Sequence, residues 1–304
     1  MQVVALVPGG IDQQILFFPT LDDLKQRYPD AEIDVVVEPQ AKGAYRLSRS
    51  VNEVLTFDYK DRNSPADWAN LLGLLRDRGY EAVLSAGGSG LALLLWLSGI
   101  PRRVGYGKGN VFLTNTVPLD SNQYAAQAYH DLLQGLDIDQ PCPELAIRIP
   151  KVDQDWAEAE RRRLTLNGYV LVHGSDAYPI ASWQKVIQEF QQKQPDIPIL
   201  LIQDEENPSW ISALSQSCPG LKVSQPNNVG KLAAMIASAN LVICTKSVTM
   251  QLAVALQVYT LALLGATDPA LVLPQADRFL GIKAATNQLA DIAPEQILQR
   301  VLEG

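Results

Sequence analysis

The sequence contains little cysteine and little histidine, with three and two of these residues among 304. Cys142, Cys218 and Cys244 lie far apart, so they suggest neither a disulfide framework nor a zinc site. We therefore expect no metal ion and no cofactor. Unpaired thiols also fit a reducing compartment, which favours the cytoplasm.

Long hydrophobic runs and an excess of positive charge are missing as well. The longest apolar stretch, residues 91–97, is too short to span a bilayer, and the N-terminus lacks the basic region of a signal peptide. The chain has 25 Lys and Arg against 33 Asp and Glu, a net charge of -8. No general positive field attracts nucleic acid. These features predict a soluble protein without nucleic-acid partners. They are compatible with a peripheral membrane contact.

Hydrophobic residues make up 47% of the chain and charged residues 19%, as in ordinary globular proteins. At roughly 150 residues per domain, the length predicts two domains. Apolar strands alternate with helical segments in both halves, which is typical of parallel sheets covered on both faces. We expect an N-terminal domain over residues 1–145 and a C-terminal domain over residues 150–304, with the last helix free to pack back on the first domain.

The predicted strands are short apolar runs that end at turn residues. In the first half they cover residues 3–7, 32–38, 53–59, 81–85 and 102–106. In the second half they cover residues 169–173, 197–203, 221–224, 240–244 and 259–265. Helical spacing fills most of the intervals. The first helix is expected over residues 15–28, and a long helix is expected over residues 123–136.

Ligands of open α/β sheets bind at the carboxyl ends of the strands. Four such ends carry turn or polar residues, namely residues 8–12, 173–175, 245–251 and 265–269. Helix N-termini at these places would suit phosphates, although no dinucleotide fingerprint and no P-loop is present. The simpler alternative is that these are tight turns between strands and helices.

Several residues allow a structural interpretation beside a functional one. Lys246 and the neighbouring hydroxyls would suit a diphosphate, while Ser247 could equally be the N-cap of the next helix. His173 at the end of a strand and His130 within a helix are expected to be packed residues. Asp22 and Asp23 are expected on a solvated face, and the five tryptophans are expected to anchor the packing.

Three stretches carry a resemblance to a known family. They are residues 8–38 (beginning PGGIDQQILFF), residues 97–106 (LSGIPRRVGY) and residues 232–269 (ending LLGATDP). In these stretches the sequence resembles glycosyltransferase family nine, the heptosyltransferases. The resemblance implies a GT-B architecture, with two Rossmann-like domains facing each other across a cleft. It also implies metal-free transfer of a sugar, with inversion, from a nucleotide-diphosphate donor in the second domain to a glycan or lipid-linked acceptor.

The chain departs from the family pattern at several positions. The Asp that serves the family as general base falls at Gln13, and Asp12 precedes that position by one residue. Asp12 could act as the base only if the loop bends differently, and the alternative is that it caps a helix beginning near Gln13. Lys246, Val248 and Gln251 stand where the family has Asp, Gly and His. These departures predict a site that is lost or recast.

The resemblance assigns two catalytic positions, Asp12 and Gln13. It assigns a larger set to substrate binding, with the Gly-rich loop and the strand ends of both domains expected to face the cleft: Gly9, Gly10, His173, Gly174, Ser175, Lys246, Ser247, Thr249, Met250, Gln251, Thr267 and Asp268. Three functions stay open. The first is an inverting heptosyltransferase-like enzyme with an unusual site, the second is a catalytically impaired protein that binds a nucleotide, glycan or protein, and the third is another GT-B enzyme, such as a nucleotide-sugar epimerase.

Overall fold

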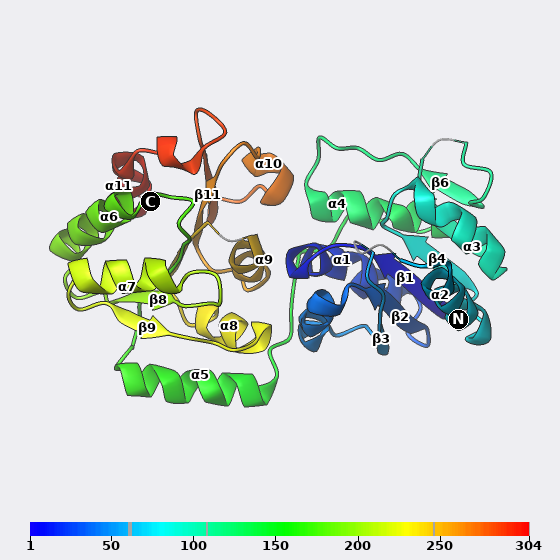
Figure 1. Cartoon of the computed structure of the whole chain (residues 1–304), viewed down its shortest axis with the longest axis horizontal. Coiled ribbons are helices and arrows are strands. Elements are labelled where there is room, and N and C mark those ends of the chain that lie inside the picture. The colour runs from blue at the N-terminus through cyan, green and yellow to red at the C-terminus, as the bar shows by residue number, and fades with distance from the viewer. Residues whose placement is uncertain (60–62, 108, 246, 304) are drawn as a thin grey trace. The chain divides into compact units, whose positions relative to one another are not determined.

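A computed structural model describes residues 1–59, 63–107, 109–245 and 247–303 of the chain. The chain divides into two compact units, Met1–Arg148 and Ile149–Gly304. Each unit is built on one six-stranded parallel sheet with helices packed around it (Figure 1). The expectation of an α/β protein with two Rossmann-like domains is confirmed.

The first unit has the strand order β3-β2-β1-β4-β5-β6. Its strands are β1 (Gln2–Val7), β2 (Glu32–Val37), β3 (Glu53–Thr56), β4 (Ala82–Ser85), β5 (Arg102–Tyr106) and β6 (Asn115–Val117). Its helices are α1 (Ile11–Arg27), α2 (Pro65–Asp77), α3 (Ala92–Ser98) and α4 (Ala125–His130), with 3₁₀ segments η1 (Pro39–Leu47), η2 (Ser89–Leu91) and η3 (Asp131–Leu136). Strand β1 lies in the middle of this sheet, and its residues 3–7 are all apolar and fully buried, as expected for a strand covered on both faces.

The second unit repeats this order as β12-β11-β10-β7-β8-β9. Its strands are β7 (Val170–His173), β8 (Ile199–Ile202), β9 (Lys222–Ser224), β10 (Leu241–Cys244), β11 (Thr260–Leu264) and β12 (Phe279–Lys283). Its helices are α5 (Lys151–Leu164), α6 (Ile180–Lys193), α7 (Pro208–Ser217), α8 (Val229–Ile236), α9 (Ser247–Ala255), α10 (Pro269–Val272) and α11 (Pro294–Glu303), with η4 at Leu289–Asp291. In both sheets the order reverses between the first and fourth strands of the unit, where such folds bind ligands.

Some elements differ from the sequence prediction at their ends or in kind. Helix α1 begins at Ile11, four residues earlier than expected, and continues through Pro19. The long helix expected over residues 123–136 is α4 followed by the 3₁₀ segment η3. Helix α11 packs against α6 and β11 of its own unit.

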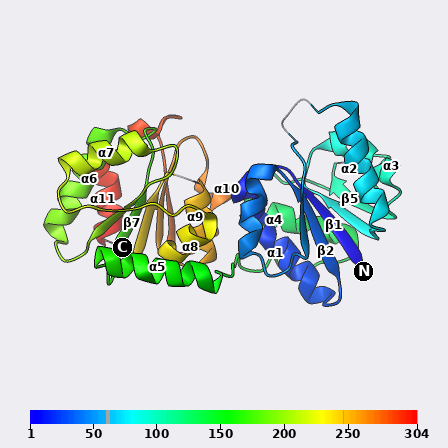
Figure 2. The ribbon, with the colours of Figure 1, turned by 60° about the horizontal axis from the view of Figure 1, so that its bottom comes forward.

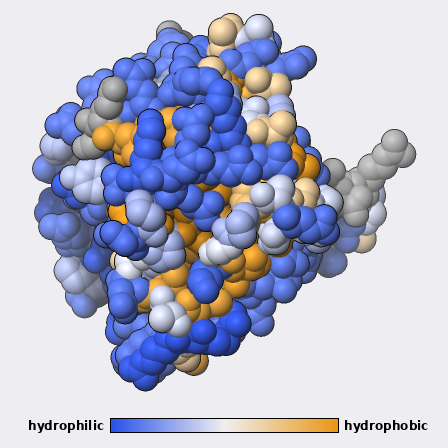
Figure 3. Space-filling model, turned by 90° about the vertical axis from the view of Figure 1, so that its left-hand side faces the viewer, coloured by the Kyte–Doolittle hydropathy of each residue, from blue (hydrophilic) through white to orange (hydrophobic). Residues whose placement is uncertain are grey.

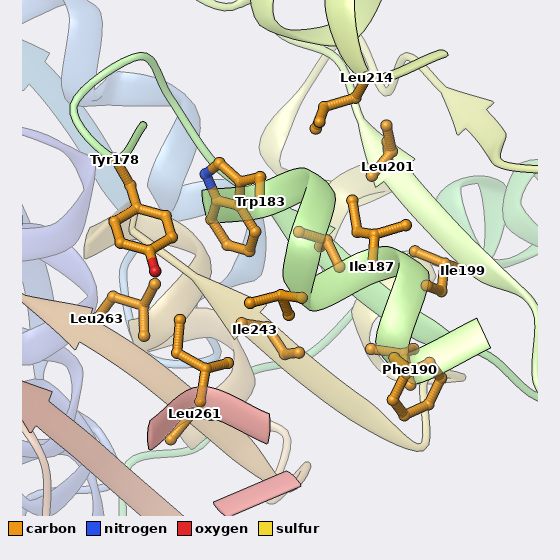
Figure 4. Close-up of a cluster of buried hydrophobic side chains, with 14 of the residues drawn as sticks. Tyr178, Trp183, Ile187, Phe190, Ile199, Leu201, Leu214, Ile243, Leu261 and Leu263 are labelled. Carbon is orange, nitrogen blue, oxygen red and sulfur yellow. The ribbon is translucent and has the colours of Figure 1, made fainter. Parts of the chain in front are cut away.

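The core of the second unit is centred on aromatic side chains. The Trp183 ring lies 5.8 Å from that of Trp210 and 5.2 Å from that of Tyr178, edge to face in both cases. Figure 4 shows the Tyr178 and Trp183 rings next to each other, with aliphatic side chains such as Ile187 filling the space beside them. The expected anchoring role is confirmed for Trp183 and Trp210, which are fully buried, and is wrong for Trp96, which is 51% exposed.

Polar side chains on α1 also contribute to packing. His130 is buried, and its Nε2 lies 2.8 Å from Oδ2 of Asp23. Asp22 accepts hydrogen bonds from the hydroxyl of Ser50 at 2.5 Å and from Nη2 of Arg49 at 2.9 Å. The structural interpretation of His130 is confirmed, whereas the prediction that Asp22 and Asp23 are merely solvated is wrong.

The surface is mainly polar on the face shown in Figure 3, where apolar side chains lie in patches between hydrophilic ones. Among the described residues, none of the helices combines the length and the apolar character needed to cross a bilayer.

Trp183→Ala should lower the free energy of unfolding of the second unit by about 3–5 kcal/mol, because it leaves a cavity in the core. Trp96→Ala removes an equally large but exposed ring and should change the stability of its own unit by less than about 1 kcal/mol. Urea unfolding followed by circular dichroism measures both. Equal effects of the two substitutions would contradict this description of the core.

Candidate functional site

The loop after β1 begins with a backbone turn that only glycine adopts easily. Gly9 has a φ of +117°, and a Cβ at this position would lie 3.0 Å from Cγ of Gln13. Gly10 follows in extended conformation and is the N-cap of α1. The Gly9-Gly10 pair therefore lets β1 turn directly into α1.

Gln13 closes the first turn of this helix. Its Oε1 accepts a hydrogen bond from the Gly10 N–H at 2.7 Å, and its Nε2 donates to Oδ2 of Asp12 at 3.1 Å. A Gln three residues after the N-cap reaches back to the N-cap N–H in the same way in capping boxes. Both ends of the Gln13 amide are thus used within the loop.

Asp12 lies in the first turn of α1 rather than before it. The prediction that it caps a helix beginning near Gln13 is therefore wrong, because the helix has already begun at Ile11. Its carboxylate is partly exposed. Burial, and after it the negative charge of Asp12, raises the pKa of Tyr129 on α4.

A buried carboxylate supports the loop from the neighbouring strand. Glu38 directly follows β2 and is 1% exposed. Its Oε1 accepts a hydrogen bond from the Gly9 N–H at 3.3 Å, and its Oε2 accepts one from Nε2 of Gln40 at 2.5 Å. Sequence reasoning missed Glu38, although an acidic residue directly after a buried strand is a signal that could have found it.

The buried side chain of Gln14 holds the loop from the interior of the unit. Its Nε2 donates to the carbonyls of Val7 at 3.0 Å and Gly9 at 3.2 Å, while its Oε1 accepts from the Tyr45 hydroxyl at 2.8 Å. Burial raises the pKa of Tyr45 well above its ordinary value, which keeps the hydroxyl protonated as a donor. This loop therefore has a single, well-supported arrangement.

The end of β4 lies against the end of β1. The Ala86 N–H donates to the Leu6 carbonyl at 3.0 Å, and a Cβ on Gly87 would come within 3.1 Å of Cγ of Pro8. A larger residue at position 87 would be crowded by this close approach. The segment Ala-Gly-Gly-Ser-Gly over residues 86–90 is glycine-rich after a strand, a signal that the sequence prediction did not use.

In the second unit, His173 at the end of β7 forms a buried bridge. Its Nδ1 lies 2.5 Å from Oγ1 of Thr249 on α9, and its Nε2 lies 3.0 Å from Oδ2 of Asp204 after β8. His173 is 4% exposed and Thr249 is fully buried. These side chains hold three elements together, and Asp204 is a partner that sequence reasoning missed.

Two indole rings pack so closely against Gly174 that they leave no space for a side chain there. A Cβ there would lie 2.6 Å from Cζ2 of Trp210 and 2.9 Å from Cζ2 of Trp183. The Gly174 carbonyl accepts from Nδ2 of the buried Asn207 at 3.1 Å. The glycine is therefore explained by packing.

The hydroxyls of Ser175 and Thr245 bring the ends of β7 and β10 together, with 3.4 Å between the two oxygens. Ser247 is exposed and is the first residue of α9, so the prediction that it precedes the helix as an N-cap is wrong. Lys246 lies outside the described residues.

The remaining predicted residues lie on α9 and before α10. Met250 and Gln251 are 3% and 1% exposed, and Nε2 of Gln251 donates to the Val272 carbonyl at 2.9 Å. Asp268 is the N-cap of α10, where its Oδ1 accepts from the Ala270 N–H at 3.0 Å. Thr267, which precedes it, is exposed.

The predicted site residues thus form two groups within the units. Gly9 and Gly10 in the loop after β1 lie next to Asp12 and Gln13 in the first turn of α1. His173, Ser175 and Thr249 meet at the carboxyl end of the second sheet. That both groups face one cleft stays a prediction.

Metal and thiol chemistry find little support in this arrangement. Within the described ranges, no group of three or more His, Cys, Asp or Glu side chains is placed to hold a metal ion. Burial raises the pKa of the Cys142 and Cys244 thiols to about 12, which disfavours the thiolate that a nucleophile requires.

Comparison with known proteins adds a family and several similar folds. The sequence profile of glycosyltransferase family 9 (heptosyltransferase) matches residues 68–301, so the Gly9-Gly10 loop precedes the matched region. Among curated proteins, the photosynthetic NDH subunit of subcomplex B 1 of Arabidopsis thaliana, a chloroplastic protein, is 26% identical over 94% of this chain and 70% of its own length.

Among solved structures, a family 9 glycosyl transferase from Veillonella parvula has a TM-score of 0.84 at 17% identity, covering 100% of this chain and 97% of that one. An Escherichia coli heptosyltransferase solved with ADP-2-deoxy-2-fluoro heptose has a TM-score of 0.77 at 19% identity, covering 100% and 99%. At these identities the likeness concerns the fold.

Gln13→Ala should destabilise the first unit by about 1 kcal/mol, the usual effect of losing a helix cap. Gln13→Glu should cost less, because a carboxylate can still accept from the Gly10 N–H. Urea unfolding gives the stability, and amide hydrogen exchange at Gly10 reports the bond itself. Unchanged exchange at Gly10 in Gln13→Ala would show that the amide does not close this turn.

Proposed function

Because this chain belongs to glycosyltransferase family 9, we propose that it binds ligands on a heptosyltransferase fold without transferring sugar by the family's base. Its biological role would then be that of a binding subunit. The ligand we propose for the second unit is a nucleoside diphosphate or its sugar conjugate.

One observation carries the proposal, namely the state of Gln13. The resemblance aligns Gln13 with the carboxylate that serves the family as general base, and an amide does not take a proton at neutral pH. Its two polar atoms are bonded to the Gly10 N–H and the Asp12 carboxylate. The side chain therefore supports the start of a helix, a role that requires no catalysis.

The second unit offers groups that suit a diphosphate at the carboxyl end of its sheet. The hydroxyls of Ser175 and Thr245 lie there, and the exposed Ser247 opens α9. Helix N-termini favour anions, and Lys246 is our candidate for a charged contact. His173 is buried behind these groups and would position the loop without touching the ligand.

The relatives support both parts of the proposal. The E. coli heptosyltransferase was solved with an ADP-sugar analogue, which supports a nucleotide ligand. The Arabidopsis relative is named as a subunit of a photosynthetic NDH complex, which supports a role in an assembly.

Sugar transfer with Asp12 as the base is the second candidate. The observation that favours it is a partly exposed carboxylate next to the family's position. The acceptor would then be a glycan or a lipid-linked glycan, as the family resemblance implies. Asp12 could serve only if its carboxylate reached the acceptor hydroxyl within about 2.6–3.2 Å, or through one water.

Asp12→Asn separates the two candidates. We expect the parent protein to bind ADP in isothermal titration calorimetry and to form no glycoside from ADP-heptose and a lipopolysaccharide acceptor in mass spectrometry. Asp12→Asn should then leave ADP binding unchanged. If the parent does transfer sugar, and Asp12→Asn lowers turnover by about 10²–10⁴-fold, the second candidate is correct.

Asp155→Asn is the matched control for this experiment, because Asp155 is an exposed carboxylate on α5 that forms a surface ion pair with Lys151 at 2.8 Å. It should change neither binding nor turnover. A parent protein that neither binds ADP nor transfers sugar would overturn the proposed nucleotide site.

A further inference from the structure

Helix α3 turns an apolar face to solvent. Leu93, Trp96 and Leu97 are spaced so that they share one side of the helix, and they are 47%, 51% and 40% exposed. Leu94 and Leu95 point inward and are buried, so the helix is apolar on both sides. Figure 2 shows α3 lying beside α2, with which it packs.

The loop between β5 and β6 extends this face. The Phe112 ring lies 5.9 Å from that of Trp96, and the neighbouring Val111 is 83% exposed. We refer to Leu93, Trp96, Leu97, Val111 and Phe112 as the α3 face. Four of these five side chains are exposed, and Phe112 is partly buried. Single exposed apolar residues are common, whereas such a group is not.

Two arginines are fixed at the border of the α3 face. Nε and Nη2 of Arg76 donate to the Leu97 carbonyl at 3.0 and 2.6 Å. Nε of Arg103 donates to the Phe112 carbonyl at 2.9 Å, and its Nη1 donates to the Ile100 carbonyl at 2.5 Å. Within the described part of the chain, neither guanidinium is paired with a carboxylate, so both positive charges stay uncompensated.

The sequence shows the same local charge imbalance. No Asp or Glu stands between Glu81 and Asp120, although the chain carries 33 of them and a net charge of -8. The same stretch contains Arg102, Arg103 and Lys108. An apolar face within a purely basic stretch of an acidic protein is complementary to a surface that is both apolar and anionic.

We propose that the α3 face binds the surface of an anionic lipid bilayer. Trp, Phe and Leu side chains enter the boundary between headgroups and acyl chains, while arginines pair with headgroup phosphates. Protruding side chains such as Val111 favour a bilayer over a protein partner, because a bilayer accepts them without a matching pocket. This inference does not rest on the proposed function.

Vesicle co-sedimentation tests the proposal with the full chain. We expect the parent protein to bind vesicles of 70% phosphatidylcholine and 30% phosphatidylglycerol, and to bind pure phosphatidylcholine vesicles about tenfold more weakly, because the arginines then lack anionic lipid. Raising the NaCl concentration from 50 to 500 mM should weaken the binding, since salt screens exposed charges.

Two variants locate the contact. Leu93→Ser combined with Trp96→Ser should lower the binding to anionic vesicles by about tenfold or more, through the loss of inserted apolar side chains. Arg76→Glu should lower it as well, and more strongly at low salt, because Arg76 is an exposed arginine at the border of the α3 face. Val152→Ser combined with Tyr259→Ser is the matched control, because both side chains are exposed apolar residues of the second unit, 63% and 61% exposed.

The control should bind vesicles as the parent does, and circular dichroism should show all variants folded. A parent protein that does not sediment with anionic vesicles would overturn the proposal, as would equal binding by the α3-face and control variants. Loss of a protein complex by the α3-face variant, without any vesicle binding by the parent, would identify the face as a protein interface instead. ADP titrations without vesicles test the proposed function separately.

Discussion

The hydrogen bond from the Gly10 N–H to the Gln13 side chain is the contact on which the first unit's loop depends. It fixes where α1 begins, and so where the side chains at positions 12 and 13 lie relative to the end of β1. Glu38 and Gln14 hold the same loop from the neighbouring strand and from beneath. An amide does not take a proton from a substrate at neutral pH, so the role that the structure gives Gln13 is to support the start of α1.

In the second unit, too, residues at an expected ligand site have a structural role in the fold. His173 stands at the carboxyl end of the first strand of the sheet, where a ligand would be expected, yet it is buried between Thr249 and Asp204. The absence of a side chain at Gly174 is explained by the close packing of two tryptophan rings, and no bound phosphate is needed to explain it. Our proposal therefore assigns the ligand to the hydroxyls of Ser175 and Thr245 and to the start of α9.

Most of the fold could be predicted from the sequence because central parallel strands are buried on both faces and read as apolar runs, as residues 3–7 do. The edge strands β6 and β12 escaped prediction because neither is an uninterrupted apolar run: β6 begins with Asn115 and Thr116, and Gly281 interrupts β12. Pairs such as His173 with Asp204, or Asp23 with His130, join residues far apart in the chain, and no local pattern announces them. The capping role of Gln13 depends on a helix start that local spacing placed four residues too late.

The central claim is that Gln13 gives this loop a structural side chain in place of the family's base. The most direct measurement is sugar transfer from ADP-heptose to a lipopolysaccharide acceptor by the parent and by Gln13→Asp, followed by mass spectrometry at equal occupancy of the donor. The account predicts no product from the parent and measurable product from Gln13→Asp. Transfer by the parent at a rate that Gln13→Asp does not raise would contradict it.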